Sequence, residues 1–555
     1  MSTELRMLAA IVLSFLIFFL YQVLFVKSPP PEKKGPARKA EVAERQVPAA
    51  DKDVRVLDEK PLEVQAGVSE PERKGRTITV STPLYLAEFT EKNGALKSFK
   101  LRNYNESLEP GSPMKELIRQ PDEGEQTLMV SFLGESVRGL RGAVFDASTE
   151  ADFVGVTENG GRLGFAWSSP GGVTILKAYT FLPDTYEMGL EIKVRNPSPW
   201  AIDENLTVSL RNSLNGAENS RYVFSGPAAL INGELNEIKI KKISNQDKLT
   251  GHIRWVAYED QYFVSAIIPQ EAAEASMGLG ITPATGVLET TYIDPSGPVL
   301  PRTERAYRYT VYFGPKSLET LGSVGADLAK VVDFGFFDII AKPLLHVMNF
   351  MYQHLPNYGV AIIIVTIIVK ILFWPLSNKS YKSMSQMKKL QPKMAELRAK
   401  HKNDKKKMNQ EIMGLYKLYK INPLGGCLPM ILQIPVFFAF YKMLYQAIEL
   451  RHAPFLLWIN DLSAPDRLFH FSFKIPMMTP PYGIPVLTII MGASMFLQQK
   501  MSPPPGDPTQ AKMMMFMPIF FTFIFINFPS GLVLYWLVNN LLSMAQQHYI
   551  TKKTS

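Results

Sequence analysis

The placement of long apolar runs constrains this chain more than any other feature of its sequence. One run covers residues 7–26 and the others follow residue 356, whereas the middle of the chain is polar and mixed. A helix needs ~20 apolar residues to cross ~30 Å of hydrocarbon. The pattern therefore predicts a polytopic α-helical membrane protein with a large soluble insert.

The first 74 residues predict an anchor followed by a tether. Residues 1–26 read as an uncleaved N-terminal signal-anchor helix, because bulky Tyr21 and Phe25 stand where a cleaved signal needs small residues. A cleaved signal is the alternative. Residues 27–74 are rich in Pro, Ala, Lys and Glu. Such a segment buries too little apolar area to offset chain entropy, so we expect a disordered linker.

The next region has the pattern of a β domain. Between residues 75 and 330, short runs such as "RTITVSTPLYLAEFT" approach an alternation of period two, and Gly, Pro, Asn and Asp separate them. Many short strands at this spacing predict an antiparallel sandwich. Residues 331–356 predict an amphipathic interfacial helix, although a helix packed on the sandwich fits the same pattern.

Five further apolar stretches complete a prediction of six transmembrane helices. The second span is expected at 357–377, and residues 423–550 hold helices three to six. Within that range the expected spans are 425–448, 482–501, 513–528 and 531–550.

The charge distribution predicts the orientation of the spans. Residues 378–420 contain 13 Lys or Arg and three acidic residues, a net charge of +10, while the whole chain carries +9. By the positive-inside rule this loop is cytoplasmic. We therefore expect a protein of the bacterial inner membrane. Both termini, including the tail 551–555, should lie in the cytoplasm, and the β domain should lie in the periplasm.

The basic loop itself has helical periodicity. Residues 378–422 predict an antiparallel helical hairpin with two apolar stripes, formed by Met384, Met387, Leu390, Met394 and Leu397 and by Met408, Ile412, Leu415 and Tyr419. Its lysines have two interpretations of equal weight: they enforce topology and touch anionic lipid, or they dock an acidic partner such as ribosomal RNA. The candidate docking residues are Lys388, Lys389, Lys405, Lys406 and Lys407.

The sequence lacks the local signatures of several enzyme classes. It contains no HExxH, CxxC, Walker A or GxSxG motif, and its one cysteine, Cys427, allows no intramolecular disulfide. We therefore expect no nucleotide, metal or other cofactor, and no covalent chemistry.

A lysine inside the second span is the strongest candidate for a functional residue. Lys370 interrupts "TIIVKILFWP", and it lies seven residues before Ser377. Snorkelling of its amine to the headgroups is the ordinary explanation. However, Thr366 lies one turn earlier on the same face of this span, and other spans carry polar groups in the same inner half of the bilayer, where such groups normally face a bundle interior or a wet cavity. These candidates are Thr366, Gln433, Trp536, Asn539 and Ser543.

Two explanations remain for this set of polar groups. For each amide alone, an interhelical hydrogen bond is sufficient. Their shared depth beside a cation instead predicts a hydrated groove that opens toward the cytoplasm.

Several motifs resemble the YidC/Oxa/Alb family of membrane protein insertases. Those motifs are "YKINPLGGCLPMILQIPVFFAFYKML", "FLQQKMSP", "MMMFMPIFFTFIF" and "FPSGLVLYWLVNNLLSMAQQ". In the insert, "NGALKSFKL", "WVAYEDQYF" and "YTVYFGP" resemble the Gram-negative form with a large periplasmic domain.

The resemblance implies a fold and a function. It implies a five-helix insertase core and a periplasmic β-super-sandwich similar to mutarotase-like folds. Lys370 stands where the family usually has Arg, Gln433 matches a groove amide, and Tyr535 with Trp536 matches an aromatic pair. The implied role is an insertase and folding chaperone that acts alone or with a Sec-type translocon. The implied partners are nascent membrane proteins, the translating ribosome and membrane lipids.

Two rival functions are open to the residues alone. A secondary transporter would use Lys370 as a coupling site, but it predicts inverted repeats, which the spans do not show. A tethered periplasmic carbohydrate-active enzyme would need paired carboxylates in the sandwich, which sequence cannot pair across strands.

Overall fold

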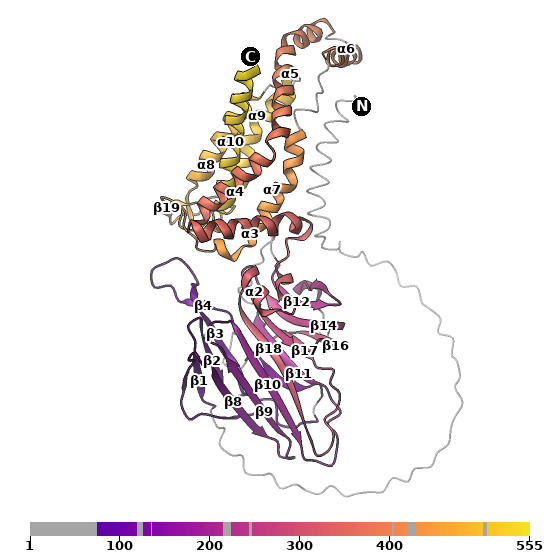
Figure 1. The fold of residues 1–555 in the computed structure, drawn as a ribbon, viewed down its shortest axis with the longest axis vertical. Coiled ribbons are helices and arrows are strands. Elements are labelled where there is room, and N and C mark those ends of the chain that lie inside the picture. Colours follow the sequence, from indigo (N-terminus) through magenta and orange to yellow (C-terminus); the bar gives the residue numbers. More distant parts are fainter. Residues whose placement is uncertain are drawn as a thin grey trace, which may run out of the picture. The chain divides into compact units, whose positions relative to one another are not determined.

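The computed structural model describes most of the chain after the predicted linker (Figure 1). The described residues are 75–118, 126–134, 136–214, 224–243, 247–401, 404–419, 428–502 and 508–554. The predicted anchor of residues 1–26, the predicted linker of residues 27–74 and Cys427 lie outside these ranges. The described chain is mostly strands before residue 316 and mostly helices after it.

A five-stranded sheet forms one layer of the β domain. Its spatial order is β4 (Met114–Glu116), β3 (Ala95–Asn105), β2 (Tyr85–Thr90), β1 (Thr77–Ser81) and β7 (Phe153–Gly155). Neighbouring strands are antiparallel except β1 and β7, which run parallel. The register places Ile78 opposite Phe89, so two apolar side chains share the buried face.

A larger antiparallel sheet of 13 strands, counted over the described residues, forms the second layer. Its path is β5 (Met129–Phe132), β11 (Leu206–Ser213), β17 (Val287–Ile293), β16 (Ala273–Thr282), β14 (Asp247–Glu259), β15 (Phe263–Pro269), β18 (Thr303–Pro315), β10 (Glu187–Asn196), β9 (Thr174–Phe181), β8 (Gly161–Ser168) and β6 (Asp146–Ala147). Two more strands, β12 (Gly226–Ile231) and β13 (Glu234–Glu237), continue beside β14.

Apolar side chains from the two sheets meet in a shared core. Burial alternates residue by residue along β10, as expected for strands with one covered face. Phe99 of β3 stacks on Phe313 of β18 with ring centroids 5.2 Å apart, and Phe89 of β2 lies 4.6 Å from Tyr179 of β9. The predicted all-β sandwich is therefore confirmed. The parallel β1–β7 pair departs from the purely antiparallel prediction, because β7 joins the edge of the small sheet beside β1.

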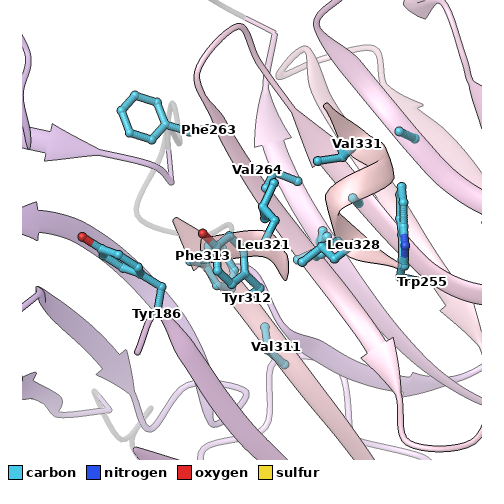
Figure 2. Close-up of a cluster of buried hydrophobic side chains, with 14 of the residues drawn as sticks. Tyr186, Trp255, Phe263, Val264, Val311, Tyr312, Phe313, Leu321, Leu328 and Val331 are labelled. Carbon is cyan, nitrogen blue, oxygen red and sulfur yellow. The ribbon is translucent and has the colours of Figure 1, made fainter. Parts of the chain in front are cut away.

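Helical turns after β18 close one end of this core. Figure 2 shows Leu321 and Leu328 beside Trp255 and Val311 of the large sheet. Leu321 belongs to α2 (Leu318–Val324) and Leu328 to the 3₁₀ helix η2 (Leu328–Val331), and both side chains are fully buried. Burying such side chains stabilises the fold by about 1.5–3 kcal/mol each.

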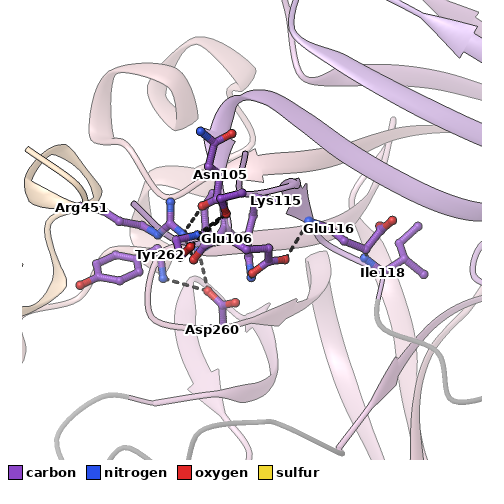
Figure 3. A network of polar contacts seen from close by, with 11 residues as sticks. Asn105, Glu106, Lys115, Glu116, Ile118, Asp260, Tyr262 and Arg451 are labelled. Carbon is purple, nitrogen blue, oxygen red and sulfur yellow. Dashed lines mark hydrogen bonds and ion pairs between the residues drawn. The ribbon is translucent and has the colours of Figure 1, made fainter. Parts of the chain in front are cut away.

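The sandwich contacts the segment that follows helix α7 through main-chain oxygens. Arg451 comes directly after the 3₁₀ helix η5 (Ile448–Leu450), and its Nη2 donates to the carbonyls of Asn105 at 2.5 Å and Glu106 at 3.3 Å (Figure 3). The guanidinium also lies 5.6 Å from the ring centroid of Phe263. Arg451 therefore makes polar contacts with the end of β3 and a cation–π contact with the start of β15.

The helical part is arranged around its last helix, α10 (Ser530–Thr554), which contacts α4, α5, α7 and α8. The other helices are α3 (Asp338–His354), α4 (Tyr358–Leu372), α5 (Trp374–Lys400), α6 (Lys405–Leu418), α7 (Leu428–Gln446), α8 (Val486–Met501) and α9 (Pro508–Phe525). Strands β19 (Leu468–Phe471) and β20 (Tyr482–Ile484) pair between α7 and α8. Among the described helices none alone is long and apolar enough to cross a bilayer, but α4 and α5 pass that test as a pair bent by 66°.

The bend between α4 and α5 corrects the predicted second span. We expected one helix over residues 357–377, but α4 ends at Leu372 and α5 starts at Trp374. Pro375 lies at the start of α5, where its missing N–H and its ring disfavour continuation of the preceding helix. Lys370 therefore lies in the last turn of α4 instead of seven residues inside a continuous span. The count of six spans stays a prediction.

Helices α5 and α6 form the predicted basic hairpin of residues 378–422 as far as it is described. Leu390, Met394 and Ile412 form a small buried cluster between the two helices. Tyr416 joins this cluster, and its hydroxyl lies 3.5 Å from the sulfur of Met394. Tyr419, which we expected in the stripe, is instead exposed and directly follows the end of α6 at Leu418.

Helix α3 has the two faces of the predicted amphipathic helix. Ala341, Leu345 and Met348 are buried, and the helix contacts α4 and α7. Ile339 and Phe350 are exposed. Its place at a membrane interface stays a prediction.

A lysine is buried in the sandwich core, and its acceptors among the described residues are backbone carbonyls. Lys177 of β9 is 1% exposed, and its Nζ donates to the carbonyls of Asn93 at 2.9 Å, Gly94 at 3.1 Å and Leu128 at 3.3 Å. Burial lowers the pKa of Lys177 from 10.5 to about 7, since the charged amine loses its hydration.

The free energy of unfolding of the sandwich should therefore rise between pH 7 and pH 9. In this window the unfolded chain holds a proton on Lys177 that the folded chain releases, so the folded state gains at most ~1.4 kcal/mol per pH unit. Urea titration of the full-length protein, read out by proteolysis of the sandwich, measures the slope. Lys177→Met should abolish the slope and Lys100→Met, on an accessible strand position, should retain it. An unchanged slope in Lys177→Met would contradict the assignment.

Candidate functional site

Lys370 reaches from α4 to the last helix of the bundle. Its Nζ donates to Ser543 Oγ at 2.7 Å, and the Ser543 hydroxyl donates to the Asn539 carbonyl one turn earlier on α10 at 2.6 Å. The ammonium therefore has a fixed partner on a neighbouring helix. In an apolar helix end, such a partner lowers the free-energy penalty of a buried charge.

A second contact extends this arrangement to α7. Gln433 Nε2 donates to Asn539 Oδ1 at 2.5 Å, and the Gln433 side chain lies close to the Tyr535 hydroxyl. Asn539 is thus the residue at which the two contacts meet. We call this set, Lys370, Ser543, Asn539, Gln433 and Tyr535, the polar chain; it connects α4, α10 and α7.

Two other predicted site residues do not join the polar chain. Thr366 is buried and its hydroxyl donates to the Ile362 carbonyl of its own helix at 2.6 Å. Trp536 packs edge-on against Phe437 with ring centroids 4.6 Å apart. Its indole Nε1 is buried and finds no acceptor in the part of the chain that is described. Both side chains therefore shape the packing of the bundle.

Lys370 also lines a recess of about 290 Å³ between α4, α5 and α10. The other lining residues are Ile367, Ile371, Trp374, Leu542, Ala545 and Gln546. Gln546 Nε2 lies 3.5 Å from the Trp374 carbonyl, so α10 contacts the first residue of α5. The recess thus combines one cation with walls that are mostly apolar.

Sequence reasoning missed two residues near Lys370. Trp374 lines the recess, and the Tyr381 side chain of α5 lies close to Ser543, the acceptor of the Lys370 contact. Both lie beyond the break at Phe373, in a stretch that we had assigned to the end of a straight span and to the basic hairpin. The proline was the signal that this stretch changes direction.

Amides on another face of α10 make ordinary interhelical contacts. Asn540 Nδ2 donates to Ser494 Oγ of α8 at 3.1 Å, and Gln547 Nε2 donates to the Met501 carbonyl at 3.0 Å. Among the described residues no group of three or more His, Cys, Asp or Glu side chains could hold a metal ion. The five lysines named for the basic hairpin lie on α5 and α6; the side chain of Lys405 lies outside the described part.

Comparisons with known proteins identify the family. The model of the 60Kd inner membrane protein family matches residues 350–555, and the model of the YidC periplasmic domain matches residues 77–347. The membrane protein insertase YidC of Syntrophus aciditrophicus is 42% identical, over 99% of both chains. The chain belongs to the YidC family of membrane protein insertases. As a member of this family it is an inner-membrane protein with a periplasmic domain.

Two further comparisons are with another curated relative and with a solved structure. The membrane protein insertase YidC of Syntrophobacter fumaroxidans is 40% identical over 99% of this chain and 100% of that protein. A crystal structure of an active YidC insertase with its first transmembrane domain resolved is 18% identical. It covers 86% of this chain and 95% of its own, with a TM-score of 0.37.

The contact between Gln433 and Asn539 should stabilise the bundle measurably. Alanine at either position removes one hydrogen bond between α7 and α10, so a double-mutant cycle should give a coupling of about 0.6–1.7 kcal/mol. Reversible unfolding in mixed micelles measures the four variants. The control cycle pairs Gln433→Ala with Asn540→Ala, whose side chain contacts Ser494 of α8, and should give no coupling. Equal couplings in the two cycles would contradict a direct contact.

Proposed function

We propose that this chain moves nascent membrane proteins from the cytoplasm into the inner membrane and assists their folding. The observation that carries the proposal is the polar chain beside the recess at Lys370, in a chain whose family consists of membrane protein insertases. It acts alone or beside a Sec-type translocon. Its further partners are translating ribosomes and membrane lipids.

The physical problem is the passage of a polar segment through hydrocarbon. Each unsatisfied backbone group there costs several kcal/mol. The polar chain offers donors and acceptors on three helices, and Lys370 adds a positive charge that attracts acidic residues of the segment. A hydrated groove at this site, open toward the cytoplasm, shortens the dry path that the segment must cross.

The walls of the recess suit release of the apolar part of a substrate. Ile367 and Ile371 of α4 line the recess and are exposed at its edge. Met513, Met515 and Met517 of α9 are also exposed, and methionine adapts to varied apolar surfaces. A substrate helix leaves sideways into lipid, and its transfer into hydrocarbon drives the process. No nucleotide hydrolysis and no covalent step are needed.

Charge at position 370 should decide the insertion of substrates with acidic tails. An attraction between unit charges ~8 Å apart is about 2 kcal/mol at an effective dielectric constant of ~20, which corresponds to roughly a thirtyfold change. Lys370→Arg should retain insertion, Lys370→Ala should lower it, and Lys370→Glu should lower it most. Protease protection of an inserted substrate measures each variant.

The matched control is Lys500→Glu. Lys500 lies at the end of α8 over the ring of Phe496 and does not line the recess. It should leave insertion close to the wild-type level. If Lys370→Glu inserts acidic-tailed substrates as well as the wild type, the electrostatic role is wrong.

The basic hairpin is proposed to dock the translating ribosome. The charge-reversal variant carries Glu in place of Lys388, Lys389, Lys406 and Lys407. It should bind ribosomes more weakly in the full-length protein. The salt dependence of binding should also fall, because fewer phosphate contacts release fewer counterions. Co-sedimentation at two salt concentrations measures this. The control is the same reversal at the exposed sandwich lysines Lys239, Lys241, Lys242 and Lys248. Unchanged ribosome binding with lost binding to anionic vesicles would assign the lysines to lipid instead.

A further inference from the structure

The segment between α7 and α8, residues 447–485, which we call the outer loop, holds bulky apolar residues in an unusual backbone conformation. Leu457, Phe469 and Met477 have φ values of 59°, 54° and 64°. Their side chains are 86%, 68% and 76% exposed. A bulky side chain at positive φ is a rare outlier, and it persists only where the surroundings dictate it. None of the three contributes to the buried core.

Hydrogen bonds within the outer loop, and from it to α8 and Asn527, hold the backbone near Leu457 and Met477. Trp458, which follows Leu457, donates from Nε1 to Asp466 Oδ1 at 2.6 Å. The other carboxylate oxygen of Asp466 accepts from the Leu487 N–H at 2.5 Å, at the start of α8. The Met477 carbonyl accepts from Asn527 Nδ2 at 2.8 Å. These hydrogen bonds therefore hold the backbone of the loop, while the apolar side chains remain exposed.

The third position lies in the hairpin of β19 and β20. A Cβ on Gly483 would come within 2.7 Å of the Phe469 carbonyl, so the two strands approach closely here. Arg467 is 8% exposed and donates to the carbonyls of Pro481 at 2.9 Å and Ile526 at 2.8 Å. The hairpin is thus attached both to its own second strand and to the turn before α10.

Exposed apolar residues of the outer loop are followed along the chain by exposed apolar residues of α8, within the region that matches the 60Kd inner membrane protein family. Ile484 of β20 and Ile489 and Ile490 of α8 are all exposed large apolar residues. In an inner-membrane protein, exposed apolar side chains of this kind are suited to contact with lipid. Because β20 leads into α8 after one residue, the exposed residues of the outer loop and of α8 are close along the chain.

The charges of the hairpin also suit a lipid surface. From Arg467 to Pro485 the sequence contains no Asp or Glu, and Lys474 is exposed beside the exposed Phe473. Exposed apolar and aromatic side chains with a nearby cation are the combination that binds anionic headgroups. A protein partner would need no such continuity with α8.

We propose that Leu457, Phe469 and Met477 insert into the leaflet opposite the basic hairpin and form a lipid anchor for the outer loop. The anchor would fix the outer ends of α7 and α8 at the headgroup level of an anionic bilayer. This surface belongs to a different end of the bundle from the recess at Lys370, so it is independent of the proposed insertion role.

Fluorophore labelling of the full-length protein tests the anchor. In a Cys427→Ser background, cysteine at each of the three positions is labelled with an environment-sensitive NBD group, and the protein is placed in nanodiscs of phosphatidylethanolamine and phosphatidylglycerol. The controls are cysteines at Leu182 and Leu300, which are exposed on the sandwich to 56% and 54%.

The anchor predicts a blue-shifted emission at the three loop positions relative to the two controls. At the loop positions, lipids with a doxyl quencher near the headgroup should reduce the fluorescence at least twofold more than dissolved iodide does. At the two control positions, iodide should reduce the fluorescence more than the doxyl lipids do. If a cysteine variant fails to fold, the neighbouring exposed Leu456 or Phe473 replaces it, with the same expected result. Loop labels that behave like the controls would overturn the proposal, as would a blue shift that arises only when a substrate protein or translocon is added.

Discussion

The hydrogen bond from Lys370 to Ser543 is the interaction on which the candidate site depends. It connects an ammonium on an otherwise apolar helix to α10, the helix around which the bundle is arranged. A cation at this place needs a partner, and a serine that is itself bonded to the Asn539 carbonyl offers one with little freedom to move. The contact thereby joins α4 to α10.

The same helix α10 connects the cation to α7. Asn539 lies one turn from Ser543 on α10. Helical geometry alone therefore places the Asn539 side chain, which accepts from Gln433, near the Lys370 ammonium. Polar groups that each suit a simple interhelical bond thus become one continuous chain of contacts. The break before Trp374 adds the apolar half of the site, because it places α5 beside Lys370 and closes the recess.

The two ends of the bundle are stabilised by different means. At the end that carries the sandwich, charged and amide side chains bind main-chain oxygens, as Arg451 does at Asn105 and Asn527 does at Met477. Because the acceptor is a main-chain oxygen, such a contact can hold a loop whatever side chain the accepting residue carries. At the hairpin end, a small apolar cluster around Met394 and Ile412 joins two helices whose remaining surface is basic.

Sequence alone determined the features that depend on neighbours along the chain. The alternation of the strands and the lengths of the apolar runs report local geometry, so the sandwich, most helices of the bundle and the residues of the polar chain were predictable. Helix breaks were not. Pro435 and Pro518 lie inside helices, whereas Pro375 begins a new one, because packing against other helices decides whether the lost hydrogen bond is tolerated.

Only the tertiary structure decided which polar side chains meet. Thr366 and Lys370 share a helix face in the sequence, yet one hydroxyl bonds its own backbone and the other side chain reaches α10. Trp536 adjoins Tyr535, but it turns toward aromatic rings instead of Gln433. The helical spacing of residues in the sequence shows on which face of its own helix a side chain lies. The partner depends on how neighbouring helices rotate and cross, and that is set by contacts between residues far apart in the chain.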